Sequence, residues 1–136
     1  VNFWKIAMKP GKPLAYGKIG NAWFFGLPGN PVSSMATYIQ IVRPNLEYMA
    51  GQSANEKLRL KVKTLDPLKK RPGRADFQRG ILSYEGDELV VRTTGHQGSH
   101  ILSSMSQANC FIVLSAESGS IAAGETVEVE PFNRTI

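Results

Sequence analysis

Residues 20–33, with the sequence GNAWFFGLPGNPVS, contain a short apolar run that leads directly into a glycine- and proline-rich turn. The apolar run, which ends at Leu27, indicates a buried strand. Residues 28–31 end that strand and begin a helix, because Asn30 is a good N-cap and Pro31 suits the first helical position. A strand-to-helix junction of this kind is typical of an α/β unit.

The sequence on both sides of this junction extends the same unit. Residues 1–9 are predicted to form a strand, and residues 9–13 a rigid loop with two prolines around a glycine. After the junction, apolar side chains recur every three or four positions, which predicts a helix that Pro44 kinks or splits and Gly51 caps. This strand–loop–strand–helix order predicts the end of an α/β domain. Two strands and one helix cannot cover both faces of a parallel sheet, so we expect the unit to need neighbours.

Beyond the polar linker at residues 52–56, the apolar pattern changes from a helical to a strand-like period. In residues 57–63, leucine and valine alternate with lysine and arginine, which predicts a half-exposed strand with one basic face. A short helix is predicted at 101–108, and further strands at 77–84, 88–93, 110–114 and 126–130. The predicted fold is an α/β remnant in residues 1–54 followed by a small all-β barrel domain in residues 55–136.

The composition is that of a soluble globular protein, with 42% hydrophobic and 20% charged residues in a chain of 136. Its net charge of +5 fits an anionic small molecule, a nucleic acid or a solvated surface. The single cysteine, Cys110, allows no internal disulfide and is expected to be a buried, unreactive thiol. No apolar stretch reaches the roughly 20 residues of a membrane span. Because the chain begins in strand-like sequence without an initiator methionine, we expect the C-terminal part of a larger enzyme.

Two neighbouring segments could bind an anion. The turn at 26–33 places free backbone N–H groups and the positive end of a helix dipole beside the Asn30 and Ser33 side chains. An ordinary strand-to-helix turn remains the alternative, and no Walker motif is present. Just upstream, Lys5, Lys9 and Lys12 form either an oxyanion pocket at the same end of the sheet or a solvated charged edge.

A third polar cluster contains Arg74, Asp76, Gln78 and Arg79, with polar histidines downstream at 96 and 100. A zinc site is not favoured, because the glycine between the two histidines disfavours the helix that would bring them together. Aspartates are scattered over separate loops and strands, so no carboxylate cluster for Mg²⁺ is recognisable.

Six segments together resemble the molybdopterin molybdenumtransferase family (the MoeA type, which includes the gephyrin E domain). They are residues 4–13, 25–33, 72–80, 94–100, 109–114 and 127–132, which follow the family's order and spacing. The resemblance implies an enzyme of molybdenum cofactor biosynthesis. Such an enzyme inserts molybdate into adenylylated molybdopterin and releases AMP, with a divalent cation such as magnesium. It also implies that residues 1–54 end a MogA-like third domain and that residues 55–136 form the fourth, a β-barrel.

The resemblance also assigns roles to residues. Lys5 and Lys9 correspond to active-site lysines of the family and are the expected catalytic residues. Arg79 and Ser99 correspond to fourth-domain residues that line the same cleft. The expected substrate-binding residues are Lys12, Gly29, Asn30, Pro31, Ser33, Arg79 and Ser99.

The remaining expectations concern what lies outside these residues. The magnesium ligands are expected upstream of Val1, with none in this chain, so the chain alone should be unable to insert molybdenum. The whole enzyme is expected to be a cytoplasmic homodimer that binds neither membrane nor nucleic acid. Two alternatives stay open: a scaffold or receptor-binding module of the gephyrin type, and a basic nucleic-acid-binding β-barrel, which the basic segments 57–63 and 69–74 suggest.

Overall fold

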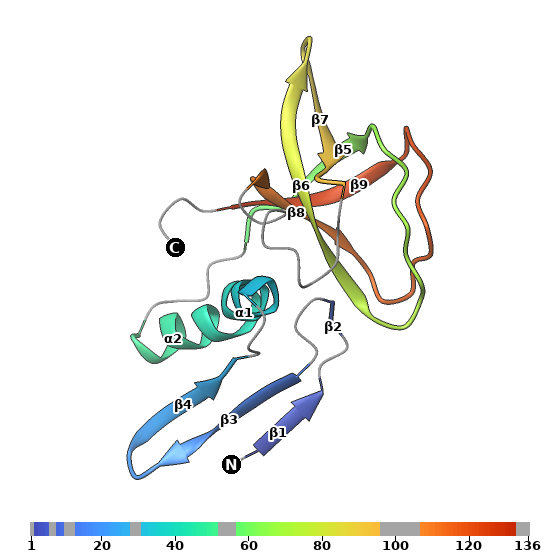
Figure 1. Cartoon of the computed structure of the whole chain (residues 1–136). Coiled ribbons are helices and arrows are strands. Elements are labelled where there is room, and N and C mark those ends of the chain that lie inside the picture. Colours follow the sequence, from blue (N-terminus) through green and yellow to red (C-terminus); the bar gives the residue numbers. More distant parts are fainter. Residues whose placement is uncertain are drawn as a thin grey trace.

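The computed structural model describes residues 2–5, 8–9, 13–27, 31–51, 57–95 and 107–132, without the side chains of 2–5, 8, 13–15 and 31–32. The chain is elongated in Figure 1, with a small sheet at one end, helices in the middle and a β-barrel at the other end. The small sheet has the strand order β1–β3–β4, formed by Asn2–Lys5, Pro13–Ile19 and Ala22–Gly26.

The small sheet corrects the sequence prediction in two respects. Strand β3 was not predicted, because PLAYGKI has no regular alternation of apolar and polar residues and carries an internal glycine. It nevertheless pairs with both neighbours, and Gly20, at a φ of 60°, forms the turn into β4. Both pairings are antiparallel, so the expectation of a parallel sheet is wrong for the strands described here.

The predicted helix is present and is irregular near Pro44. Helix α1 (Pro31–Thr37) continues into a π-helical segment, η1 (Tyr38–Val42), and then into α2 (Arg43–Met49). Pro44 thus sits in the first turn of α2, where the missing N–H is tolerated. The wider π turn before it lets the chain continue without a break. Gly51, at a φ of 84°, follows the last helical turn, as predicted.

The C-terminal half is a closed five-stranded barrel, which confirms the predicted barrel class. The strands are β5 (Leu60–Thr64), β6 (Ala75–Glu85), β7 (Glu88–Thr93), β8 (Cys110–Leu114) and β9 (Thr126–Pro131). They pair in the order β6–β7–β5–β9–β8, and β8 pairs again with β6 to close the barrel. Only the β5–β7 pairing within this ring is parallel. The predicted helix at 101–108 lies almost wholly outside the described residues.

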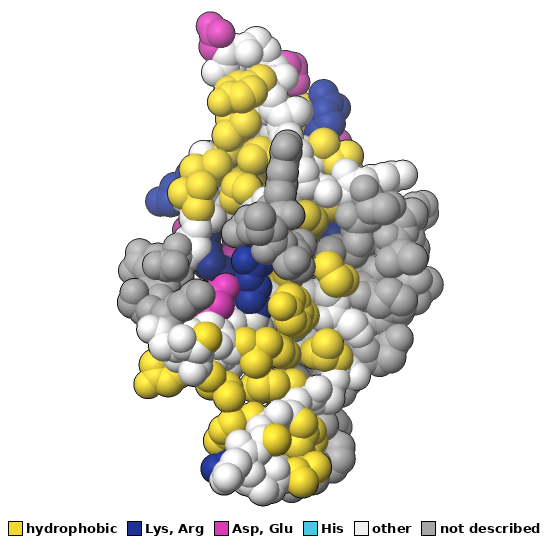
Figure 2. Space-filling view, turned by 90° about the vertical axis from the view of Figure 1, so that its left-hand side faces the viewer, with side chains coloured by type: hydrophobic (Ala, Val, Ile, Leu, Met, Phe, Trp, Pro, Cys, Tyr) yellow, Lys and Arg dark blue, Asp and Glu magenta, His cyan; other side chains and the backbone are white. Residues whose placement is uncertain are grey.

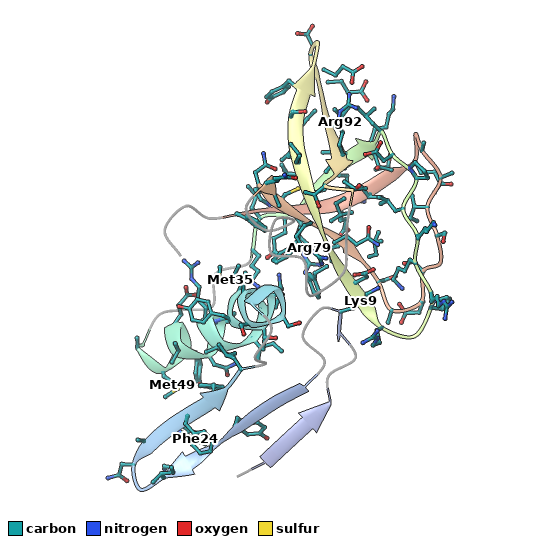
Figure 3. All side chains as sticks on the ribbon, in the orientation of Figure 1. Lys9, Phe24, Met35, Met49, Arg79 and Arg92 are labelled. Atoms are coloured by element: carbon teal, nitrogen blue, oxygen red, sulfur yellow. The ribbon has the colours of Figure 1, made fainter. Side chains whose placement is uncertain are left out.

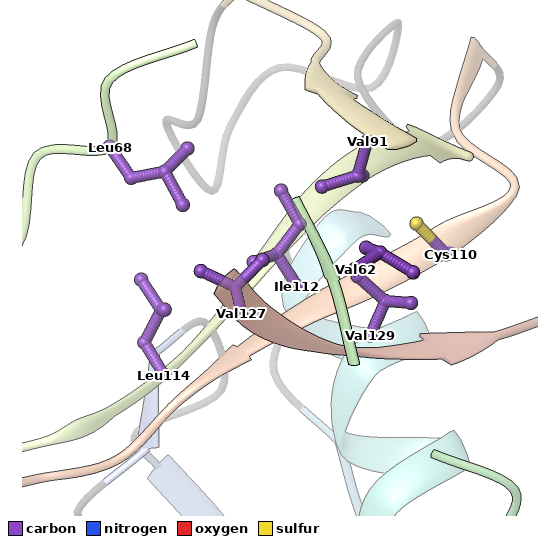
Figure 4. Packing of buried hydrophobic residues seen from close by; sticks show 8 residues of the cluster. All are labelled: Val62, Leu68, Val91, Cys110, Ile112, Leu114, Val127 and Val129. Atoms are coloured by element: carbon purple, nitrogen blue, oxygen red, sulfur yellow. The ribbon is translucent and has the colours of Figure 1, made fainter. Parts of the chain in front are cut away.

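The barrel interior is a compact apolar core. Alternate residues of its strands point inward, as the period of two requires. Figure 4 shows this core, which consists of Val62, Leu68, Val91, Cys110, Ile112, Leu114, Val127 and Val129. Burial raises the pKa of the Cys110 thiol to about 12, so the thiol remains protonated at neutral pH and is a poor nucleophile.

A second core joins the helix to the outside of the barrel. Ala36 of α1 is fully buried against Phe77 and Phe111, which are outward-facing residues of β6 and β8. The Phe111 ring makes edge-to-face contacts with Phe77 and Phe132, at centroid distances of 5.9 and 4.9 Å. The helix therefore covers one outer face of the barrel.

Polar contacts reinforce this junction at its other side. Gln40 donates to a carboxylate oxygen of Glu130 at 2.8 Å, and the Lys57 ammonium reaches the Gln40 side-chain oxygen at 2.9 Å. Lys57 and Glu130 also form an ion pair at 3.5 Å. Burial lowers the pKa of Lys57, and the Glu130 carboxylate partly offsets that effect.

Hydrophobic side chains gather over the lower half of the face shown in Figure 2, where the helices and the β3–β4 hairpin lie. The large apolar residues that are exposed on or beside these elements are Ile19, Trp23, Leu27, Leu46, Tyr48 and Met49. None of the described helices has both the length and the apolar character that crossing a membrane would require.

Candidate functional site

The two parts of the chain meet at a short parallel pairing between β2 (Met8–Lys9) and the beginning of β6. Met8 pairs with Ala75, and Lys9 with Asp76. Neighbouring residues in such a pairing project to the same side of the sheet, so the Lys9 ammonium and the Asp76 carboxylate share one side. The β2 strand thereby places a cation from the N-terminal unit against the barrel.

A cavity of about 390 Å³ opens at this pairing. Its lining residues are Lys9, Lys69, Lys70, Arg71, Pro72, Arg74 and Asp76. Five of these residues are lysine or arginine and only one is acidic, so the cavity is strongly electropositive. We call this cavity the basic cavity and residues 69–74 the basic loop.

The sequence analysis named the basic loop as a possible nucleic-acid contact and placed Arg74 in a polar cluster, but it did not connect the loop with Lys9. That loop lies 60 or more residues from Lys9 in the chain, and nothing in the sequence pattern indicates that β2 pairs beside it. The density of cations on both sides of the Pro72-Gly73 turn is the signal that could have suggested an anion site there.

Arg79 lies on the other face of β6 from this cavity. Side chains alternate along the strand, so Arg79 shares its side with Phe77, whereas Asp76 and Gln78 project to the opposite side. Arg79 is fully buried and donates to the Phe77 carbonyl oxygen at 2.9 Å. Burial lowers the pKa of Arg79, and Asp76 partly offsets this. Figure 3 shows Arg79 and Lys9 in the region where the barrel meets the N-terminal unit.

The other predicted site residues are located only in part. Lys5 ends β1 and Pro31 begins α1, but their side chains are not described. Ser33 is buried in the first turn of α1. Four predicted residues, together with the two histidines, lie outside the described part of the chain; the four are Lys12, Gly29, Asn30 and Ser99.

The described residues do not fit a metal site, because they contain no group of three or more histidine, cysteine, aspartate or glutamate side chains that could hold an ion. The location of the magnesium ligands upstream of Val1 stays a prediction.

Three cations on or just before β5 pair with neighbouring acids. Arg59 lies 3.7 Å from Glu128 of β9, and Lys63 lies 3.2 Å from Glu88 of β7. Lys57, just before the strand, pairs with Glu130. Because these three cations already have acidic partners, they are less available to a nucleic-acid backbone.

The barrel pairs with a short strand and packs against a helix, both from the preceding residues. This fold defines a class of proteins in which a small β-barrel follows an α/β unit. Residues 61–132 match the model of the MoeA C-terminal region (domain IV) family. The chain belongs to this family.

Comparison with individual relatives agrees with this assignment. The chain is 50% identical to the molybdopterin molybdenumtransferase of Haemophilus influenzae, over 100% of this chain and 34% of that protein. Molybdopterin molybdenumtransferase 1 of Mycobacterium tuberculosis is 32% identical, over 92% of this chain and 31% of that protein. The crystal structure of the molybdopterin biosynthesis moeA protein from Pyrococcus horikoshii superposes with a TM-score of 0.75 at 28% identity, covering 96% of this chain and 32% of that one. The chain thus spans about a third of the length of these relatives.

Proposed function

We propose that this chain is the C-terminal part of a molybdopterin molybdenumtransferase and supplies one cationic wall of its substrate site. The observation that carries the proposal is the β2–β6 pairing, which places Lys9 beside the basic loop of the barrel. Molybdate and molybdopterin phosphates are anions, and lysine and arginine are the side chains that bind such groups. The names of the Haemophilus and Mycobacterium relatives support the same reaction.

The role proposed for each residue follows from the chemistry of its side chain. We assign Lys9, with Lys5 upstream, to hold and neutralise oxyanion charge as it develops during transfer of molybdate. The turn at 28–33 and Ser99 are proposed to orient the substrate. Arg79 is proposed as a further substrate-binding residue on the family resemblance alone, since it is fully buried on the other face of β6 from the basic cavity.

The remaining parts of the proposal concern the whole protein. We propose a division into residues 1–54 and 55–136, a homodimeric and cytoplasmic parent enzyme, and magnesium bound by residues outside this chain. None of the described contacts favours a gephyrin-type scaffold role over this enzyme.

Complementation tests the proposed function. Lys5→Ala or Lys9→Ala would be introduced into a full-length molybdopterin molybdenumtransferase that carries this segment, in cells lacking their own enzyme. The activity of a molybdenum-dependent reductase reports cofactor formation. Loss of one charge-assisted contact predicts that activity falls about tenfold or more.

The matched control is Lys61→Ala, which removes an exposed lysine from β5, far from β2 in the order of the strands. Its activity should equal that of the wild type. Full activity of both the Lys5 and the Lys9 variants would sink the proposed function.

A further inference from the structure

The basic cavity carries an inference about which ligand group the barrel itself contacts. We propose that the cavity binds a phosphate-bearing anion with at least two negative charges, and that Lys69, Arg71 and Arg74 are its contact residues on the barrel. The proposal deepens the proposed function and rests on it for the natural ligand. It adds these three residues to the substrate-binding residues expected from the sequence.

The first argument is that the cavity's positive charge is free. Lys9, Lys69, Arg71 and Arg74 are all exposed. Within the described part of the chain, none of these four side chains forms an ion pair with a carboxylate, whereas Lys63 of β5 and Arg59, just before it, do. The one acid in the cavity, Asp76, is buried and already accepts a hydrogen bond from Gln78 at 2.9 Å. Unpaired like charges held together repel one another, and an anion would relieve that repulsion.

The second argument is that hydrogen bonds hold the basic loop in place. Lys70 is buried, and its ammonium donates to the carbonyl oxygens of Arg71 and Ser118 at 3.1 and 2.8 Å. The Lys70 backbone N–H donates to the Ser120 hydroxyl at 3.0 Å. Gln78 donates to the Lys69 carbonyl oxygen at 2.9 Å.

A hydrogen bond also holds the C-terminal end of the basic loop in place. The backbone N–H of Gly73, at a φ of 122°, donates to the Ala116 carbonyl oxygen at 2.8 Å. These contacts engage the backbone and the buried Lys70, whereas Lys69, Arg71 and Arg74 line the cavity and are exposed. A loop ordered before binding loses less conformational entropy when the ligand arrives.

The third argument concerns the kind of anion. Guanidinium groups present paired N–H donors that match the oxygens of a phosphate group. The cavity's volume of about 390 Å³ falls in the range of small-molecule sites, roughly 300–1,000 Å³, and exceeds what a single tetrahedral ion needs. None of the described residues that line it is aromatic, so this lining offers no stacking surface of the kind on which single-stranded nucleic acids depend. A phosphate-bearing small molecule therefore fits better than a polynucleotide.

Calorimetric titration of the whole 136-residue chain tests the proposal. The probes are inorganic pyrophosphate, inorganic phosphate, AMP and a ten-nucleotide single-stranded DNA. Arg71→Gln/Arg74→Gln removes two cations from the cavity, and Arg59→Gln/Lys61→Gln removes two exposed cations from β5 and the residue before it as the matched control. We expect the first pair to weaken pyrophosphate binding by about tenfold or more and the control pair to leave it unchanged.

A second, charge-conserving pair of substitutions distinguishes a loss of binding from a folding defect. Arg71→Lys/Arg74→Lys keeps both charges and loses the paired donors, so its affinity should fall between those of the wild type and the glutamine pair. Tighter binding of AMP than of inorganic phosphate would identify an organic phosphate as the natural ligand, and equal binding would identify free phosphate. Either result supports the proposal that the cavity binds a phosphate-bearing anion.

Three results would overturn the proposal. They are absence of binding by the wild type to all phosphate probes at millimolar concentration, equal affinity of the glutamine pair and the wild type, and DNA binding that outcompetes pyrophosphate. The complementation experiment is independent of these results. Intact cofactor formation in the Lys5 and Lys9 variants, with a cavity that still binds pyrophosphate, would reject the proposed function and keep the phosphate site.

Discussion

Gly80 is the residue at which the barrel tolerates least change. It lies in the middle of β6 and faces the interior. A Cβ atom there would stand 2.9 Å from Ile112 Cγ1 and 3.0 Å from Val91 Cγ2. Both are side chains of a tightly packed core with little room to move. The absence of a side chain at this position lets β6 and β8 approach as the closed barrel requires.

Gly80→Ala should therefore destabilise the protein through overpacking, by about 1–3 kcal/mol in the free energy of unfolding. Urea denaturation monitored by circular dichroism measures this change. Gly119→Ala is the control, because a Cβ atom at Gly119 meets no heavy atom within 4 Å and should change stability little. Equal stability of the two variants would contradict the proposed crowding.

At the residue scale, the sequence predicted the type of chemistry better than its exact location. Lys9 was expected at an anion site, and the structure places it at the basic cavity. Arg79 was also expected in the substrate cleft; it lies on the other face of β6 from the basic cavity and is buried, and its role stays a prediction. Which face a strand residue occupies depends on what the strand packs against, and that information comes from distant parts of the chain.

At the element scale, the join between helix and barrel depends on one buried carboxylate. Glu130 of β9 is 5% exposed and accepts from Gln40 of η1 while pairing with Lys57. Glu128, two residues earlier on the same strand, makes a similar ion pair with Arg59, but its side chain is 46% exposed. The two glutamates differ mainly in their exposure to water.

Glu130→Gln should lower the free energy of unfolding by about 1–3 kcal/mol, because it leaves Lys57 without its carboxylate and weakens the contact with Gln40. Glu128→Gln should change it by less than about 1 kcal/mol, since water screens exposed pairs. Thermal and urea unfolding of both variants give the comparison. Equal destabilisation by Glu128→Gln and Glu130→Gln would contradict the larger contribution expected of the buried glutamate.

Elements with a clear pattern were predicted well. The β8 strand and the hairpin of β6 and β7 match their predicted positions closely, because their residues alternate or form an apolar run next to glycine turns. Strand β3 was missed because its local sequence carries no such pattern, and its strand conformation comes from hydrogen bonding to two neighbours.

At the scale of the whole molecule, Phe111 connects the two parts. Its ring is fully buried between Phe77 and Phe132 in the core that also contains Ala36 of the helix. Its neighbour in the strand, Ile112, faces the barrel interior instead. The β8 strand thus contributes to both cores and couples the helix to the barrel.

Phe111→Ala should lower the free energy of unfolding by about 3–5 kcal/mol, because it removes buried apolar surface and leaves a cavity. Hydrogen exchange should show reduced protection in α1 and in the barrel strands together. Tyr84→Ala removes an aromatic residue that is 74% exposed and should change stability by less than about 0.5 kcal/mol. Loss of protection confined to the barrel would show that the two parts are not coupled through this core.

The sequence by itself determined the small barrel, most of its strands and the helix that precedes it. These follow from apolar periodicity, turn residues and charge, which are local properties of the chain. Only the tertiary structure decided that β2 pairs with β6 and that Lys9 meets the basic loop across one cavity. The physical reason is that these contacts join residues 60 or more positions apart, whose pairing depends on barrel closure and on the packing of the helix.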